Sequence, residues 1–131
     1  MRDIKFRAID AMTGKMVYGD LTHNKKVTKT GLEPRVMVGG YEVDPDTVCE
    51  YTCFKDMADN EIYEYDIVEY QGCFKGVNCP RFLVKRCDRT GVFEIDRGLA
   101  IDTVLACDLC HRYVVVGNVF ENQELLGEDG V

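Results

Sequence analysis

Three residues in the last quarter of the chain come closest to a chemical motif, because Cys107, Cys110 and His111 read Cys-x-x-Cys-His. These letters mark covalent haem attachment in exported proteins, but the first ten residues form a strand pattern and not an export signal. A redox dithiol needs its first thiol at the start of a helix, whereas residues 112–116 also read as a strand. Haem and redox chemistry are therefore both disfavoured, and no cofactor is expected.

Zinc suits the same cysteines better, since thiolate and imidazole groups are its usual ligands. Cys107, Cys110 and His111 would supply two or three of the four ligands. The thiols that would complete a tetrahedron are Cys49 with Cys53, or Cys73 with Cys79. Only Cys107 and Cys110 are tightly spaced, and seven cysteines cannot all pair within one chain. We therefore expect reduced thiols and no bound metal, with zinc binding through Cys107 and Cys110 as an alternative.

Other catalytic patterns are missing from the sequence. One of its two histidines, His23, lies in a polar stretch beside Asn24 and Lys25, which favours an exposed and inert side chain. No glycine-rich phosphate loop is present, and carboxylates in the middle of the chain are too dense for any one pair to stand out. The sequence predicts a protein that is not an enzyme.

Charge is unevenly distributed along the 131 residues. Residues 1–41 carry eight basic and four acidic side chains, residues 42–70 carry one and ten, and the remainder carries seven and nine, so the net charges of +4, −9 and −2 sum to −7. The acidic segment is either a solvated surface or a docking face for a basic partner. The candidate docking residues are Asp56, Asp59, Glu61, Glu64 and Asp66. We expect a homo-oligomer, in which basic and acidic segments of different copies pair, or a partner with a basic surface.

A nucleic-acid-binding module is the alternative function. Lys25, Lys26, Lys29 and Arg35 form a basic cluster, and tyrosines and phenylalanines are available for stacking on bases. The sequence pI is about 4.8, however, and domains that bind phosphate backbones are usually basic. We therefore expect weak or absent binding to nucleic acid.

The elements that would position these residues are mostly strands. Apolar and polar residues alternate in residues 4–8, and Thr13-Gly14 supplies a turn before residues 16–18, so an N-terminal hairpin is predicted. Residues 22–34 are polar and lysine-rich and are predicted to form a loop or a mobile excursion. Further strands are expected at residues 36–38, 47–54, 61–70, 82–84, 92–95, 100–106 and 112–120, with a turn at 56–60 and one short helix at 121–126.

Many short strands separated by turns predict a mainly β fold of the barrel or sandwich kind. We expect two parts, an N-terminal β hairpin and arm region at residues 1–46 and a small β-barrel domain at residues 47–131. The longest apolar runs have only a few residues, so no membrane span is expected, and the expected location is the cytoplasm.

Three pieces of the chain resemble the YopX family of phage and prophage proteins. The pieces are residues 2–8 with 15–18, residues 51–52 with 55–56, 61–64 and 66–68, and residues 116–122 with 124–126. The resemblance implies a phage-derived protein in a bacterial host, with a small SH3-like barrel in its second half, and it implies no activity. A host or phage protein with a basic surface would then be the partner.

Two residues depart from the family pattern. Cys53 and Tyr65 stand where the family favours glycine. If those glycines adopt a positive φ, this chain must either shift its turns or accept backbone strain.

Overall fold

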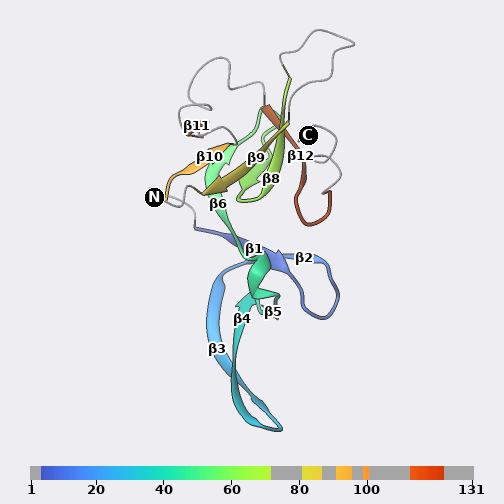
Figure 1. Cartoon of the computed structure of the whole chain (residues 1–131), viewed down its shortest axis with the longest axis vertical. Helices are drawn as coiled ribbons and strands as arrows, with labels where there is room; N and C mark the ends of the chain where they lie inside the picture. Colours follow the sequence, from blue (N-terminus) through green and yellow to red (C-terminus); the bar gives the residue numbers. More distant parts are fainter. Residues whose placement is uncertain (1–3, 72–80, 87–90, 96–98, 101–112, 123–131) are drawn as a thin grey trace. The chain divides into compact units, whose positions relative to one another are not determined.

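The computed structural model describes residues 4–71, 81–86, 91–95, 99–100 and 113–122 (Figure 1). The chain divides into two compact units, Met1–Tyr51 and Thr52–Val131. Among the described residues, the single helical element is a three-residue 3-10 helix, η1 (Pro45–Thr47). The prediction of a mainly β protein is confirmed.

Unit 1 begins with the predicted N-terminal hairpin. Strands β1 (Phe6–Ile9) and β2 (Met16–Gly19) pair antiparallel, with Ile9 opposite Met16. The turn between them is held by Asp10, whose Oδ1 accepts a hydrogen bond from the Met12 N–H at 2.8 Å. On its other side, β1 pairs with the first residues of β6 (Cys49–Lys55), a strand that starts in unit 1 and continues into unit 2.

The second sheet of unit 1 has the order β3-β4-β5. Strands β3 (Leu21–Thr28) and β4 (Gly31–Val38) form a long hairpin, here called the arm, and β5 (Tyr41–Glu42) pairs with the end of β4 (Figure 1). The prediction of a loop over residues 22–34 is therefore wrong. Most of the arm has both faces in solvent, so its sequence does not need the apolar alternation by which a half-buried strand is recognised.

A close crossing of two backbones fixes the base of the arm. Gly39, directly after β4, has φ +61°, and a Cβ at this residue would overlap the carbonyl oxygen of Tyr18. A Cβ on Gly19 would lie 2.7 Å from the Gly39 Cα. Two glycines are therefore required where the chain enters and leaves the arm.

The core of unit 1 includes the base of the arm. Its buried residues are Ala8, Val38 and Val43. Partly buried apolar side chains pack against them from β1, β2, β3, β4 and the residue after η1, namely Phe6, Val17, Leu21, Val36 and Val48. Thr47, the last residue of η1, links this helix to β1, because its Oγ1 accepts from the Ile9 N–H at 2.9 Å. The same Oγ1 donates to the Asp44 carbonyl at 2.7 Å. The arm is thus anchored at one end and exposed at the other.

Unit 2 contains a five-stranded antiparallel sheet with the order β11-β10-β9-β8-β12. Its strands are β8 (Asp66–Tyr70), β9 (Arg81–Arg86), β10 (Phe93–Ile95), β11 (Leu99–Ala100) and β12 (Tyr113–Asn118). Strand β7 (Glu61–Tyr63) pairs with β6, and the Thr52 Oγ1 donates to the Ile62 carbonyl at 2.7 Å. The single strand predicted at residues 61–70 is in fact two strands, divided by a turn at Glu64 and Tyr65.

One hydrophobic core lies in unit 2. Ile62, Val68, Val84 and Ile95 are buried, and Phe54, Phe82, Phe93, Tyr113 and Val115 pack around them. The described strands form a curled sheet, and they do not by themselves establish a closed barrel. Beyond Asn122, the predicted helix at residues 121–126 lies outside the described residues, and residues 119–121 form a turn in which the Asn118 Oδ1 accepts from the Phe120 and Glu121 N–H groups.

Candidate functional site

Asp56 lies in the middle of the acidic segment, and its carboxylate is committed to the fold. The side chain is 7% exposed. Oδ1 accepts hydrogen bonds from the N–H groups of Ala58 at 2.9 Å and Asn60 at 2.8 Å, and Oδ2 accepts from the Val115 N–H at 2.9 Å. This carboxylate closes the β6–β7 turn and ties it to β12, so it does not face a partner.

Asp66 has a similar internal role at the next turn. It is 1% exposed, and its Oδ2 accepts from the Tyr63 N–H at 2.7 Å. A carboxylate three residues after the donor stabilises the tight link between β7 and β8. Of the five candidate docking residues, Asp56 and Asp66 are therefore buried parts of turns.

The other three candidates reach solvent to different degrees. The Asp59 side chain is 84% exposed, and its Oδ1 lies 3.7 Å from the Lys55 Nζ. Glu61 is half-buried and accepts a hydrogen bond from the Tyr63 hydroxyl at 3.2 Å, and Glu64 is also half-buried. Next to them, Met57 is 54% exposed. We call Met57, Asp59 and Glu61 the acidic turn, and docking through it stays a prediction.

The basic cluster lies on the arm, and the strand register sorts its side chains onto two faces. Directly opposite residues in an antiparallel pair share a face, and successive residues alternate. The pairs Asn24 with Arg35 and Lys26 with Glu33 therefore lie on one face. The opposite face carries the pairs His23 with Val36, Lys25 with Pro34 and Val27 with Leu32.

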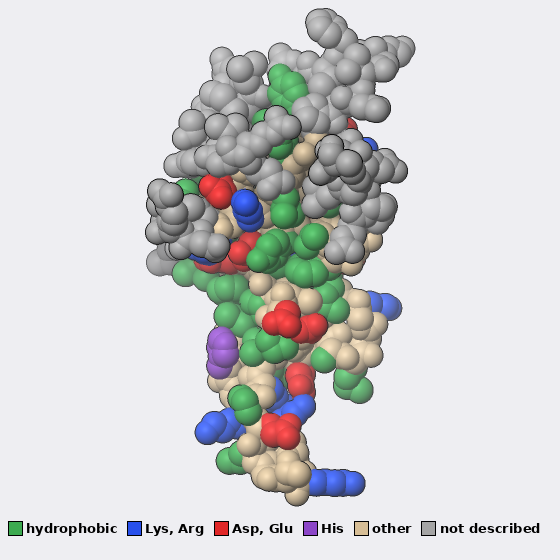
Figure 2. Space-filling model, viewed as in Figure 1, with side chains coloured by type: hydrophobic (Ala, Val, Ile, Leu, Met, Phe, Trp, Pro, Cys, Tyr) green, Lys and Arg blue, Asp and Glu red, His purple; other side chains and the backbone are tan. Residues whose placement is uncertain are grey.

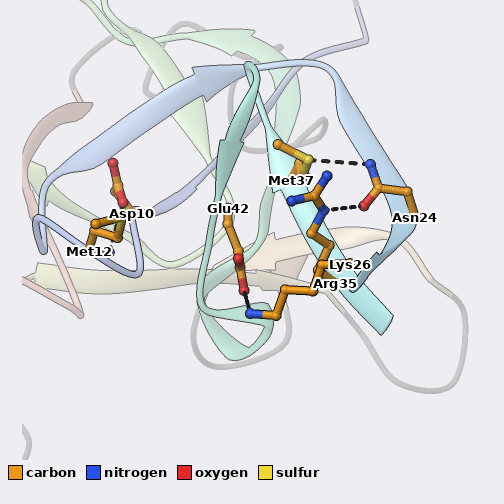
Figure 3. Close-up of polar contacts among 7 residues, drawn as sticks. All are labelled: Asp10, Met12, Asn24, Lys26, Arg35, Met37 and Glu42. Atoms are coloured by element: carbon orange, nitrogen blue, oxygen red, sulfur yellow. Dashed lines mark hydrogen bonds and ion pairs between the residues drawn. The ribbon is translucent and has the colours of Figure 1, made fainter. Parts of the chain in front are cut away.

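The first of these faces is polar and internally bonded (Figure 3). The Arg35 Nε donates to the Asn24 Oδ1 at 2.5 Å, and the Asn24 Nδ2 donates to the Met37 sulfur at 3.4 Å. Lys26 extends to β5, where its Nζ lies 2.8 Å from the Glu42 Oε2. Two of the four cations in the predicted basic cluster therefore already have partners within unit 1.

The second face, which we call the arm face, is apolar and basic. Its members are His23, Lys25, Val27, Leu32, Pro34 and Val36. Val27 is 84% exposed and Leu32 65% exposed, and Lys25 is exposed beside them. Figure 2 shows hydrophobic, basic and acidic side chains on the outer part of the arm. Sequence reasoning missed this surface, and the signal that was available is the apolar or basic residue at every second position from His23 to Val27.

The described cysteines are engaged in the fold. Cys49 is buried, with its Sγ 3.1 Å from the Thr47 carbonyl, and Cys53 is half-buried in β6. Within the described ranges, no group of three or more His, Cys, Asp or Glu residues could hold a metal ion. The zinc candidates Cys107, Cys110 and His111, together with Cys73 and Cys79, lie outside these ranges.

Left-handed backbone conformations occur at both residues where the sequence departs from the family pattern. Cys53 has φ +72° and Tyr65 has φ +68°. The chain therefore keeps a glycine-type conformation with side chains present and accepts the strain, which is one of the two outcomes expected from the sequence. At Tyr65 the ring also contacts Phe120 edge-on, with centroids 5.8 Å apart.

No described helix is long and apolar enough to cross a membrane. Comparison with curated proteins gives no match. A family model described as YopX protein matches residues 5–127, which is nearly the whole chain. Among solved structures, the chain is similar to the crystal structure of protein EF1440 from Enterococcus faecalis, with a TM-score of 0.62 and 22% identity over 96% of this chain and 99% of that one. This likeness concerns the fold alone.

Proposed function

The chain belongs to the YopX family, and on this premise we propose that it is a phage or prophage accessory protein that acts through protein contacts, including contacts between its own copies, and not as an enzyme. Its expected place of action is the cytoplasm of a bacterial host. The observation that carries the proposal is the arm, which projects two exposed strands with an apolar and basic face. An exposed surface of this kind is typical of recognition sites.

Charge segregation supports the same proposal. The chain has a net charge of −7, whereas the arm has four basic residues and one acidic residue, a net of +3. A basic projection on an acidic protein is attracted to acidic surfaces, including those of other copies, and the attraction falls with salt.

We also propose that unit 2 is a small SH3-like barrel. The β8, β9 and β10 strands follow one another in the sheet, and β12 returns to pair with the outer side of β8. The short helix expected at residues 121–126 is part of this proposal.

Sedimentation velocity of the purified chain over a wide range of protein concentration tests the proposal. We expect association that increases with concentration and weakens at high salt. A monomer at every concentration and salt would contradict the self-association.

Two binding titrations separate the alternatives. Tight, salt-dependent binding to arbitrary duplex DNA, lost when Lys25 and Lys29 are changed to Glu, would favour a nucleic-acid module instead. One equivalent of zinc in the purified protein, lost in Cys107→Ser, would favour a zinc protein. We expect neither result.

A further inference from the structure

We propose that the arm face of one copy docks onto the acidic turn of a second copy. This inference rests on the proposed function, because it names the surfaces through which the chain would self-associate. It commits to a second copy because this chain itself carries the complementary surface.

The apolar part of the arm face is a continuous stripe. Val27 and Leu32 are directly opposite each other, so their side chains are neighbours on one face, at 84% and 65% exposure. Pro34 and Val36 continue the same face toward the base of the arm, where Val36 packs against the buried core. Single exposed apolar residues are ordinary on protein surfaces, whereas contiguous exposed apolar side chains are typical of interaction sites.

Charge argues against the docking of two identical arm faces on each other. The arm face carries Lys25 and no carboxylate, and Lys29 is exposed at the tip. The arm's acidic residue, Glu33, lies on the opposite face. Two arm faces in contact would therefore bring lysines together without compensation.

The acidic turn carries an exposed carboxylate, which the arm face lacks. Its Asp59 side chain is 84% exposed, and Met57 beside it presents an apolar side chain at 54% exposure. The Lys55–Asp59 pair is solvent-exposed and 3.7 Å apart, so it competes weakly for the Asp59 carboxylate. The exposed Met57 side chain and the exposed Asp59 carboxylate of this turn match the Val27–Leu32 pair and Lys25 of the arm face in both polarity and charge.

The two surfaces differ, so two arrangements satisfy the contact. Two copies can exchange arms reciprocally in a two-fold dimer, or each copy can give its arm to one neighbour and receive an arm from another, which generates a closed ring or an open filament. We therefore expect the sedimentation series to show dimers or larger assemblies.

The decisive variant is Val27→Ser with Leu32→Ser, followed by sedimentation of the full chain. Both residues are largely exposed, so folding is retained, as circular dichroism would verify. We expect the dissociation constant to rise by about tenfold or more, because two apolar side chains lose a buried environment. The matched control is Met12→Ser, since Met12 is 92% exposed in the same unit but lies away from the arm. The control should associate like the parent chain.

A double-mutant cycle with Lys25→Ala and Asp59→Asn tests the partner surface. Asparagine keeps the left-handed conformation of Asp59, which has φ +68°. If the two charges meet, each single change weakens association and the second adds little to the first. Effects that multiply independently would overturn docking on the acidic turn.

The outcomes separate the two proposals. Association that is unchanged in the Val27→Ser and Leu32→Ser double variant overturns the arm contact but leaves self-association standing. Absence of association in the parent chain overturns both.

Discussion

Two hairpins of this protein, the exposed arm β3–β4 and the largely buried hairpin β6–β7, use their charged residues in opposite ways. The turn of β6–β7 directs the Asp56 carboxylate inward, where it accepts hydrogen bonds from its own turn and from β12. The arm keeps its charged side chains at the surface, bonded across its polar face or exposed on the arm face. A high density of charge in a sequence therefore does not show which charges are available to a partner.

Backbone conformation also differs between the two units that contain these hairpins. In unit 1 every described residue with a positive φ is glycine, including Gly31, Gly39 and Gly40 in and after the arm. In unit 2 the described positive-φ residues include Cys53, Asp59 and Tyr65. Unit 1 thus makes its turns without strain, whereas unit 2 keeps side chains in a conformation that costs roughly 1–2 kcal/mol for a residue other than glycine or Asn/Asp.

The largest expected effect comes from Asp56→Ala. We expect unit 2 to lose roughly 3 kcal/mol of stability, because three backbone N–H groups lose their acceptor and are left partly buried. Denaturant unfolding measures the change. Asp59→Asn is the control on the same turn, and its effect should stay within about 0.5 kcal/mol because the side chain is exposed. Equal effects would mean that the turn does not depend on the inward carboxylate.

Gly39→Ala should have the next largest effect, a loss of about 2–3 kcal/mol, because the new Cβ meets both a left-handed backbone and the Tyr18 carbonyl. Gly40→Ala is the matched comparison. Gly40 also has a positive φ, +89°, but a Cβ there meets nothing within 4 Å. The difference in unfolding free energy between the two variants therefore measures the backbone crossing, and identical losses would show that the crossing is loose.

Cys53→Gly should act in the opposite direction to the changes in unit 1. Release of the left-handed strain favours the variant, whereas the freedom of glycine in the unfolded chain offsets part of it. We expect a net stabilisation of about 0.5 kcal/mol, seen as a small rise in the midpoint of thermal unfolding. A clear loss of stability would show that contacts of the Cys53 side chain outweigh the strain.

The smallest effect is expected for the ion pair across the polar face of the arm. Lys26 and Glu42 are each about one-third exposed, so a double-mutant cycle with Lys26→Ala and Glu42→Ala should give a coupling of about 0.5 kcal/mol that shrinks at high salt. A coupling well above that, and insensitive to salt, would show that the arm has a rigid, desolvated base instead of a solvated surface.

The sequence predicted best those features that depend on neighbouring residues. The hairpin of β1 and β2 follows from local alternation and Thr13-Gly14, and the turn at residues 56–60 follows from its Asp and Asn residues. The arm could not be recognised in this way, because its two faces are mostly exposed and its pairing is not encoded by an apolar pattern.

The sequence also could not show that Asp56 is buried whereas Asp59 is exposed. Both carboxylates stand in the same turn, three residues apart, and both fit a docking face. Asp56 is buried because the Val115 N–H, far away in the chain, comes to its Oδ2. Burial of this kind is decided by the tertiary fold and not by the local residues.

The hydrogen bond between Asp56 and Val115 spans 59 positions of the chain, and this separation has a consequence for the order of folding. The arm closes through a two-residue turn, so its two strands can pair from the tip in about 1–10 µs, as local hairpins do. The Asp56 contact must wait until a long loop has closed, and loops of that kind slow the search for the native state. We therefore expect the bond between Asp56 and Val115 to form after the rate-limiting step, whereas the bonds to Ala58 and Asn60 are local. Stopped-flow kinetics should then show that Asp56→Ala speeds unfolding more than it slows refolding.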